Sequence, residues 1–308
     1  MPDLTILIPL YNEARNVRPL YEEVVRVVTR LEKSYEIIYV DDGSSDGTYD
    51  EVRALHSQDK NVRLIRHRRN FGKAQALSNG FSAAQGQVII TMDGDLQDDP
   101  EEIPRFLEKI AQGYDLVSGW KTNRQDQWSK TLPSKAFNAI TRWVSGVKLH
   151  DFNCGFKAYR ADVVKDVDVY GEMHRYIPVI AAREGFKVGE LAVHHRARLH
   201  GRSKYGITRL ATGVFDLFTI AFVTKYLDRP LHLFGSIGTV LFSLGFIAGL
   251  YLTYLWYIDV IIWNRPLLIL AVLFMLAGIQ FFSTGLFCEL LVRLNRHKRG
   301  VERVREQW

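Results

Sequence analysis

Cysteine is scarce in this chain of 308 residues, which contains only Cys154 and Cys288, and the second of them lies in an apolar run. Two distant cysteines provide neither a disulfide framework nor the ligand spacing of a zinc site, so they favour a reducing compartment. Residues 1–9 lack the basic segment and the cleavage site of a signal peptide. We therefore interpret them as a first strand and expect the soluble part of the chain to stay in the cytoplasm.

Two common nucleotide-binding signatures are absent as well. The chain has neither a Walker A sequence nor a Gly-x-Gly-x-x-Gly fingerprint, which argues against a P-loop ATPase and a dinucleotide oxidoreductase. The net charge is +6, yet no motif of interleaved aromatic and basic residues accompanies that charge. We therefore expect no nucleic-acid partner.

Basic residues gather in the last segment of the chain, at Arg293, Arg296, Lys298, Arg299, Arg303 and Arg305. A solvated helix end would have the same composition. Because the segment directly follows an apolar run, we expect it to lie on anionic lipid headgroups, with about 1 kcal/mol per basic residue near the surface.

Short apolar runs alternate with amphipathic stretches over the first 120 residues or so. The runs are rich in Ile, Val and Leu and have the length of strands; they cover residues 4–9, 36–41, 62–66, 88–92 and 115–120. Helical patterns follow Asn12, Gly47, Lys73 and Pro100. This alternation predicts an α/β fold with a mostly parallel sheet covered on both faces. In such a sheet, binding sites lie at the carboxyl ends of the strands.

The central candidate site follows the fourth predicted strand, where Asp93, Gly94 and Asp95 stand in sequence. Side chains two positions apart on a strand point to the same side, so we expect the two carboxylates to lie together. Hard divalent cations that also bind phosphate prefer such oxygen ligands, and Gln97 adds a neutral oxygen. Asp-x-Asp also occurs in ordinary turns, but here two other strand ends carry acidic or polar residues.

Those two other strand ends belong to the first and second predicted strands. Pro9, Tyr11, Asn12 and Glu13 end the first, and Asp41 and Asp42 end the second. An N-capped turn is the alternative interpretation of the second group. Further on, Gly72 and Lys73 open another predicted helix, whose free amides and ammonium group are suited to phosphate.

The last hundred residues have the pattern of a membrane protein. Residues 205–226 form a broad apolar face at helical spacing, which favours a helix lying in the membrane interface over a core helix. Residues 231–258 and 266–288 contain no Asp, Glu, Lys or Arg and are long enough to span a bilayer. A soluble helical hairpin is the alternative. Lys225, Arg229 and the basic tail flank the pair, so the positive-inside rule predicts both ends in the cytoplasm.

These patterns divide the chain into four parts. We expect an α/β domain over residues 1–204, an amphipathic helix over 205–229, a transmembrane hairpin over 230–292 and a basic cytoplasmic tail over 293–308.

Taken in order, the motifs resemble a known family. They are Pro9-Leu10-Tyr11-Asn12-Glu13, Val40-Asp41-Asp42-Gly43-Ser44, Asn70-x-Gly72-Lys73, Asp93-Gly94-Asp95-Leu96-Gln97, His150-Asp151-Phe152-Asn153-Cys154-Gly155 and Gly201-Arg202-Ser203-Lys204-Tyr205. Together they look like glycosyltransferase family 2, with the GT-A fold. The closer resemblance is to polyprenyl-phosphate hexosyltransferases, namely dolichyl-phosphate mannose synthases and bacterial undecaprenyl-phosphate glucosyltransferases, and it covers essentially the whole chain.

The resemblance implies a role for each matched residue. Residues that bind the nucleotide sugar would be Pro9, Tyr11, Asn12, Glu13, Asp41, Asp42, Gly72, Lys73, Asp93 and Gly94. Ligands of Mg²⁺ or Mn²⁺ would be Asp93, Asp95 and Gln97. Residues that bind the lipid phosphate would be Lys121, Arg124, Lys135, Arg202, Ser203 and Lys204. Asp95 and Asp151 would be catalytic, although Asp151 is also suited to capping the following turn. Lys121 stands where the family often has Arg.

The implied reaction is an inverting transfer of a hexose to a polyprenyl phosphate at the cytoplasmic face of the plasma membrane. Glucose from a UDP donor is our first choice, because residues 119–127 look more like the bacterial glucosyl and aminoarabinosyl transferases than the mannosyl ones. GDP-mannose is the alternative donor. We also expect homo-oligomers through the hairpin.

Two other functions were weighed. A processive polysaccharide synthase would carry Gln-x-x-Arg-Trp, whereas Arg142 and Trp143 are preceded by Ala139 at the Gln position. A non-catalytic membrane sensor of nucleotide sugars would not need intact metal carboxylates.

Overall fold

The computed structural model describes residues 2–122, 138–167, 173–196, 222–226, 229–258 and 266–296. The chain divides into two compact units, Met1–Ile220 and Ala221–Trp308. The first is the α/β unit and the second contains the two long apolar helices. The predicted boundary after residue 204 lies outside the described residues.

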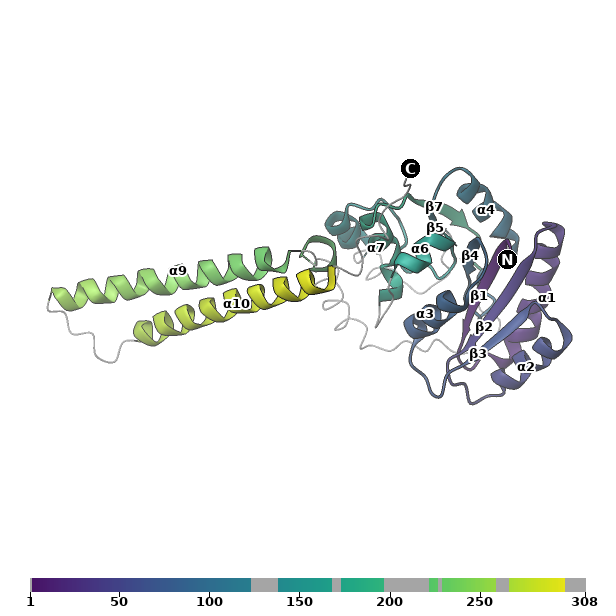
Figure 1. The fold of residues 1–308 in the computed structure, drawn as a ribbon, viewed down its shortest axis with the longest axis horizontal. Helices are drawn as coiled ribbons and strands as arrows, with labels where there is room; N and C mark the ends of the chain where they lie inside the picture. Colours follow the sequence, from purple (N-terminus) through teal and green to yellow (C-terminus); the bar gives the residue numbers. More distant parts are fainter. Residues whose placement is uncertain are drawn as a thin grey trace. The chain divides into compact units, whose positions relative to one another are not determined.

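A seven-stranded sheet forms the centre of the first unit (Figure 1). Its strands are β1 (Leu4–Leu10), β2 (Tyr35–Asp41), β3 (Val62–Arg66), β4 (Val88–Thr91), β5 (Leu116–Lys121), β6 (Lys157–Arg160) and β7 (Val188–Val193). They are ordered β3-β2-β1-β4-β6-β5-β7. Only β6 runs against its neighbours β4 and β5, while all other pairs are parallel. The prediction of a mostly parallel α/β sheet is therefore confirmed.

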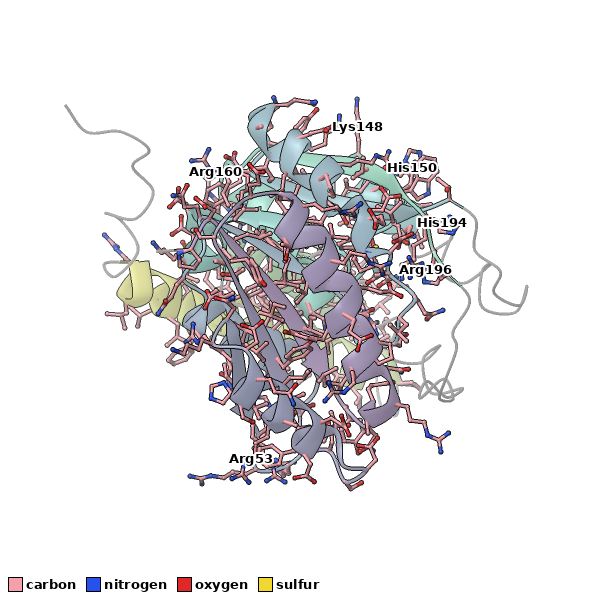
Figure 2. The ribbon with its side chains drawn as sticks, turned by 90° about the vertical axis from the view of Figure 1, so that its right-hand side faces the viewer. Arg53, Lys148, His150, Arg160, His194 and Arg196 are labelled. Atoms are coloured by element: carbon pink, nitrogen blue, oxygen red, sulfur yellow. The ribbon has the colours of Figure 1, made fainter. Side chains whose placement is uncertain are left out.

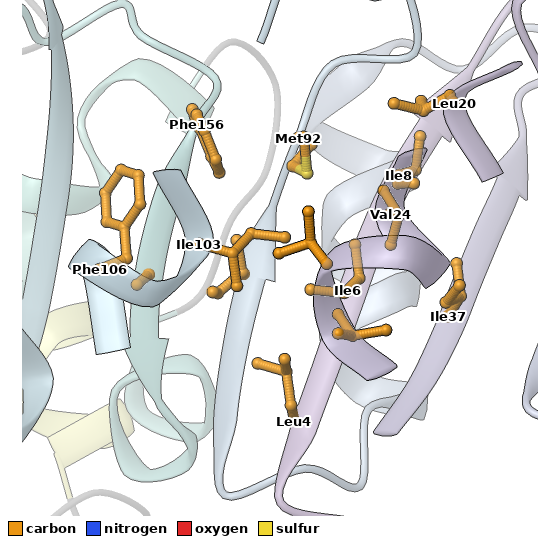
Figure 3. Packing of buried hydrophobic residues seen from close by; sticks show 14 of the residues in the cluster. Leu4, Ile6, Ile8, Leu20, Val24, Ile37, Met92, Ile103, Phe106 and Phe156 are labelled. Carbon is orange, nitrogen blue, oxygen red and sulfur yellow. The ribbon is translucent and has the colours of Figure 1, made fainter. Parts of the chain in front are cut away.

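Helices cover both faces of this sheet. The helices of the first unit are α1 (Ala14–Arg30), α2 (Thr48–Gln58), α3 (Lys73–Ala83), α4 (Ile103–Ala111), α6 (Ala161–Asp166) and α7 (Ile177–Arg183), with short 3₁₀ turns η1 (Pro100–Glu102) and η2 (Met173–Arg175). In the first core cluster, Leu20 and Val24 of α1 pack on Ile6 of β1, and α2 and α4 belong to the same cluster (Figure 3). In the second cluster, Leu7 of β1 packs with residues of α3, α6 and α7.

The first five strands lie within one residue of the predicted positions at either end, since the nearly continuous burial along β1 and β2 follows the apolar runs. The strands β6 and β7 were not predicted. They belong to a stretch that is rich in charged residues, and their strand conformation depends on pairing with distant β4 and β5.

The second unit contains two antiparallel helices, α9 (Pro230–Tyr257) and α10 (Pro266–Arg296) (Figure 1). Their mean hydropathies are 1.9 and 2.3, and both are long and apolar enough to cross a membrane. Glycines bring the backbones together: a Cβ on Gly238 would lie 2.7 Å from the carbonyl oxygen of Gly278, and one on Gly245 would lie 2.6 Å from that of Ala271. Close approach through small residues is how membrane helices gain packing energy.

One acid occurs inside α10, at Glu289. Its carboxylate Oε2 accepts a hydrogen bond from the backbone N–H of Leu231, at 3.4 Å. Leu231 lies in the first turn of α9, where backbone donors have no partner within the helix and a negative charge is favoured. The acid therefore pairs the last turns of one helix with the first turn of the other.

The predicted amphipathic helix lies mostly outside the described residues. Within it the structure describes Phe222–Tyr226, which forms a short π-helical turn, and Arg229, which precedes α9. The basic tail beyond residue 296 is not described either.

The glycine contacts lead to a test of the hairpin. A leucine at Gly238 cannot fit against Gly278, so we expect Gly238→Leu to lower the free energy of unfolding by about 1–3 kcal/mol, as overpacking does. Gly249→Leu is the matched control, because no atom lies within 4 Å of a Cβ at that position. Thermal unfolding of the detergent-solubilised chain measures both variants. Equal losses in the two would contradict the packing seen here.

Candidate active site

The loops that follow β1 and β2 are bound to each other. Asn12 has a positive φ of 54°, which turns the chain sharply after Tyr11. Its N–H donates to Ser44 Oγ at 2.9 Å, and its side-chain oxygen accepts from the N–H of Ser45 at 2.8 Å. The N–H of Glu13 donates to Thr48 Oγ1 at 2.9 Å. This rim of the sheet is therefore assembled from two strand ends before any ligand binds.

The carboxylates at the end of β2 both lie inside the protein. Asp41 is fully buried, and its Oδ1 accepts from the N–H of Ser44 at 3.0 Å. Asp42 binds the loop before α3: its oxygens accept from the N–H groups of Phe71 and Gly72, each at 2.8 Å, and lie 2.7 Å from His67 Nδ1. The predicted role of Asp42 at the nucleoside remains a prediction, and its observed role is to fix the turn that opens α3.

Asp93 lies two residues beyond β4, because the strand ends at Thr91. The expected strand alternation therefore does not orient Asp93 and Asp95, which belong to a turn. Lys73, at the start of α3, forms an ion pair with Asp93 Oδ1. Burial raises the pKa of Asp93, but the positive charges of Lys73 and Lys121 outweigh it and hold that pKa well below the ordinary value.

Asp98 completes a cluster of alternating charge. Its Oδ2 accepts from the backbone N–H of Asp93 at 3.0 Å, and its Oδ1 lies 3.4 Å from Lys121 Nζ. Burial raises the pKa of Asp98, partly offset by Lys121. For Lys121, burial lowers the pKa, but Asp98 and the other nearby acids raise it above the ordinary value, so the ammonium stays charged. Lys121 was predicted to bind lipid phosphate, and the structure pairs it with Asp98.

Asp95 and Gln97 lie on either side of a strained residue, Leu96, whose φ is +62°. Asp95 is 8% exposed, and its Oδ1 accepts from the N–H of Gln97 at 3.2 Å. The amide of Gln97 donates to the carbonyl oxygen of Arg196 at 3.4 Å. A positive φ at a bulky residue costs energy and commonly marks a functional turn.

The Asp93 carboxylate packs closely against Gly155. A Cβ on Gly155 would lie 2.5 Å from Asp93 Oδ1 and 2.6 Å from Oδ2, so the carboxylate fills the space that a side chain would take. Within the described ranges, no group of three His, Cys, Asp or Glu residues could hold a metal. Asp93 and Asp95 are carboxylates, the donor type that a hard divalent cation bound to phosphate and water prefers, so their chemistry fits such an ion; ligation by these residues stays a prediction.

Residues 150–155 form the loop that leads into β6. Asp151 is 2% exposed, and its Oδ1 accepts from the N–H of Asn153 at 3.0 Å, which is the capping contact weighed as its alternative role. Lys157 is 3% exposed and donates to the carbonyl oxygens of Phe152, at 3.4 Å, and Cys154. Burial raises the pKa of the Cys154 thiol to about 12, so that thiol is neutral.

Several residues of the site were not predicted from the sequence: Asp98, Lys157 and His174 near Asp93, and His67 beside Asp42. His174 of η2 is half-buried, and its desolvation, with Lys73 nearby, lowers its pKa to about 2. Five predicted residues lie outside the described ranges: Arg124, Lys135, Arg202, Ser203 and Lys204.

The chain belongs to glycosyl transferase family 2, whose model matches residues 5–168. It is therefore a glycosyltransferase, and its fold is GT-A, as predicted. The structure of glucosyl-3-phosphoglycerate synthase from Mycobacterium tuberculosis with Mn²⁺, UDP and phosphoglyceric acid superimposes with a TM-score of 0.56 at 18% identity. That alignment covers 72% of this chain and 78% of the other. A mannosyltransferase from Pyrobaculum calidifontis with GDP-Man and Mn²⁺ gives a TM-score of 0.52 at 18% identity, over 72% and 63% of the two chains.

Two curated relatives match over nearly the full length. Dodecaprenyl-phosphate galacturonate synthase of Rhizobium johnstonii is 39% identical, over 94% of this chain and 88% of the relative. Undecaprenyl-phosphate 4-deoxy-4-formamido-L-arabinose transferase of Proteus mirabilis is 34% identical, over 96% of this chain and 90% of the relative. Both names describe transfer of a sugar to a polyprenyl phosphate.

Proposed function

We propose that this glycosyltransferase moves a sugar from a nucleotide donor to a polyprenyl phosphate at a membrane surface. The observation that carries the proposal is the turn after β4, where Asp93 forms an ion pair with Lys73 and Asp95 follows two residues later, in a chain that also has two apolar helices. The carboxylates are suited to binding a divalent cation, and the ammonium group of the lysine is suited to a diphosphate. The full-length similarity to two polyprenyl-phosphate transferases supports the choice of acceptor.

The chemistry follows from the charges of the reactants. An oxygen of the acceptor phosphate, already an anion, attacks the anomeric carbon, while the bond from that carbon to the nucleoside diphosphate breaks with inversion. A bound Mg²⁺ or Mn²⁺ would supply Lewis-acid stabilisation of the leaving diphosphate. Lys73 and Lys121 add positive charge beside it, and the Asp42 contacts hold the turn from which Lys73 extends. Asp151 orients the sugar or the acceptor.

The sugar is proposed to be glucose, carried by UDP, with GDP-mannose as the alternative donor. The relatives are named for galacturonate and 4-deoxy-4-formamido-L-arabinose, so these sugars belong in the same test.

The test is a donor screen with the full chain in membranes. Labelled nucleotide sugars, short polyprenyl phosphates and Mg²⁺ or Mn²⁺ are supplied, and lipid-extractable labelled sugar is measured. We expect one donor to give a lipid-linked product. A water-soluble polymer would instead support a processive synthase, and no transfer with any donor would support the sensor.

The membrane arrangement is part of the proposal. We infer that α9 and α10 span the plasma membrane with both ends of the chain in the cytoplasm, because Lys225 and Arg229 precede α9 and Arg293 lies in the last turn of α10. Labelling of a cysteine introduced at Asp259 should occur only from the outer side. Homo-oligomers through the hairpin, which crosslinking in membranes would detect, remain a prediction.

The lipid-phosphate contacts of Lys121, Arg124, Lys135, Arg202, Ser203 and Lys204 also remain predictions. Their test is whether alanine substitution raises the KM for polyprenyl phosphate while nucleotide affinity stays unchanged.

A further inference from the structure

A single glutamate of β7 binds the loop that carries Asp151. Glu190 Oε1 accepts hydrogen bonds from the N–H groups of His150, at 2.7 Å, and Asp151, at 3.2 Å. Its other oxygen, Oε2, lies 2.7 Å from His150 Nδ1. The side chain of Glu190 is 13% exposed, whereas that of His150 is 53% exposed, so Glu190 is the more buried partner of these contacts. Hydrogen bonds to a carboxylate are shorter and stronger than those between neutral groups.

The imidazole of His150 is held on a second side. It stacks on the indole of Trp120, with ring centroids 4.2 Å apart and planes inclined by 17°. Trp120 precedes Lys121 on β5, which pairs in parallel with β7. Figure 2 shows His150 along the same edge of the unit as His194 and Arg196, which follow β7. Two neighbouring strands thus fix this one residue.

The same loop is also bound from the protein interior by Lys157, whose pKa is lowered by burial. Lys157 donates to the carbonyl oxygens of Phe152 and Cys154. Glu190 therefore binds backbone donors at the start of the loop, and Lys157 binds backbone acceptors further along it. Between these contacts lies Asp151, and the loop ends at Gly155, which borders the Asp93 carboxylate.

We propose that Glu190 is a positioning residue, which acts on sugar transfer by fixing the backbone of His150 and Asp151 and so the direction of the Asp151 carboxylate. This inference rests on the proposed function, because it assigns Asp151 to the reacting sugar or acceptor. Glu190 itself touches the loop and not the substrates. Misplacement of a catalytic group by about 1 Å can cost about a hundredfold in rate.

The first test is a double-mutant cycle in the full chain, measured as lipid-linked sugar. Glu190→Ala is expected to lower kcat at least twentyfold and to leave the KM for the nucleotide sugar within about twofold. Glu190→Gln, which keeps an acceptor oxygen for the two amides, should recover part of that loss. If Glu190 acts through Asp151, Glu190→Ala combined with Asp151→Asn is no slower than Asp151→Asn alone.

Glu36 provides the matched control. It also lies on a strand, β2, and its buried carboxylate accepts from Thr5 Oγ1, the N–H of Gln85 and Arg63 Nη1 at 2.7, 2.7 and 2.6 Å. It lies near the start of β2, whereas the site lies at the carboxyl ends of the strands, so Glu36→Ala should lower Tm without a comparable fall in kcat. Additive losses in the cycle, or an unchanged rate in Asp151→Asn, would overturn the proposal for Glu190.

A second measurement does not depend on turnover. Amide hydrogen exchange of the full chain should become at least tenfold faster at His150 and Asp151 in Glu190→Ala, because both N–H groups lose their acceptor. Unchanged exchange there would overturn the proposal even if activity fell. The wild-type chain could transfer no sugar to polyprenyl phosphate while these amides respond as expected. That result would disprove the proposed function but would leave the structural role of Glu190 supported.

Discussion

Asp95→Ala is expected to reduce sugar transfer by at least about a thousandfold while the protein stays folded. The carboxylate of Asp95 is 8% exposed and lies in the strained turn after β4. Removing one preorganised group that stabilises transition-state charge costs about 10²–10³ in kcat, and loss of a metal ligand adds to that. Asp93→Ala should be equally inactive and also less stable by about 1–3 kcal/mol, because it removes the ion pair between Asp93 and Lys73.

Activity is measured as labelled lipid product at saturating Mn²⁺. Folding and stability are measured by circular dichroism on the same preparations. Asp162→Ala is a suitable control, because Asp162 has a side chain that is 67% exposed on α6. Full activity of both site variants in the presence of a chelator would show that the reaction does not need the metal.

The pKa of Asp93 is lower in the folded protein than its unfolded value of 3.8. The ion pair of Asp93 therefore stabilises the fold above pH 3.8, and this stabilisation is lost as the pH falls through the lower folded pKa. An activity loss near neutral pH would therefore come from another group.

Gly155→Ala is expected to lower transfer about a hundredfold, although it adds only one methyl group. A Cβ at this position would lie 2.5 Å from Asp93 Oδ1, so the carboxylate must move to make room. Displacement of a catalytic group by about 1 Å is sufficient for a loss of this size. The side chain of Asp93 is 29% exposed, so it can turn towards solvent, and the fold should tolerate the change better than the reaction.

The discriminating measurement is the Mn²⁺ concentration that gives half-maximal activity. It should rise at least tenfold in Gly155→Ala, because a displaced Asp93 is a poorer ligand. Gly249→Ala is a neutral glycine control, with no atom within 4 Å of its Cβ. A variant with wild-type metal dependence but reduced stability would indicate that Gly155 matters for folding alone.

The parallel half of the sheet was predictable because each of its strands is an apolar run between two helical patterns. The strand β6 was not predictable from the sequence. It has only four residues, Lys157–Arg160, and the charged residues at its two ends break any apolar run. Nothing local distinguishes such a segment from a loop. Its conformation comes from pairing with β4 and β5, and a single-sequence pattern does not record those partners.

The candidate site was likewise predictable only in part. Asp93 and Asp95 follow an apolar strand, and that position alone indicated them. Asp98 and Glu190 stand among many other charged residues, and only their contacts with Asp93 and His150 single them out. The sequence also indicated Asp42 as a nucleotide-binding residue, which stays a prediction; the hydrogen bonds that its carboxylate accepts from the N–H groups of residues 71 and 72 were not foreseen.

The position of β7 in the chain has a consequence for biosynthesis. All seven strands precede Pro230, where the first long apolar helix begins. Ribosomes add about 5–20 residues per second and domains commonly fold as they emerge, so the sheet can close before α9 has been made. A nascent chain that ends before residue 188 would already contain the turn with Asp93 and Asp95. It would lack the strand that binds the loop of Asp151, and it would lack the apolar helices, so a prematurely released fragment would be an incomplete enzyme without a membrane anchor.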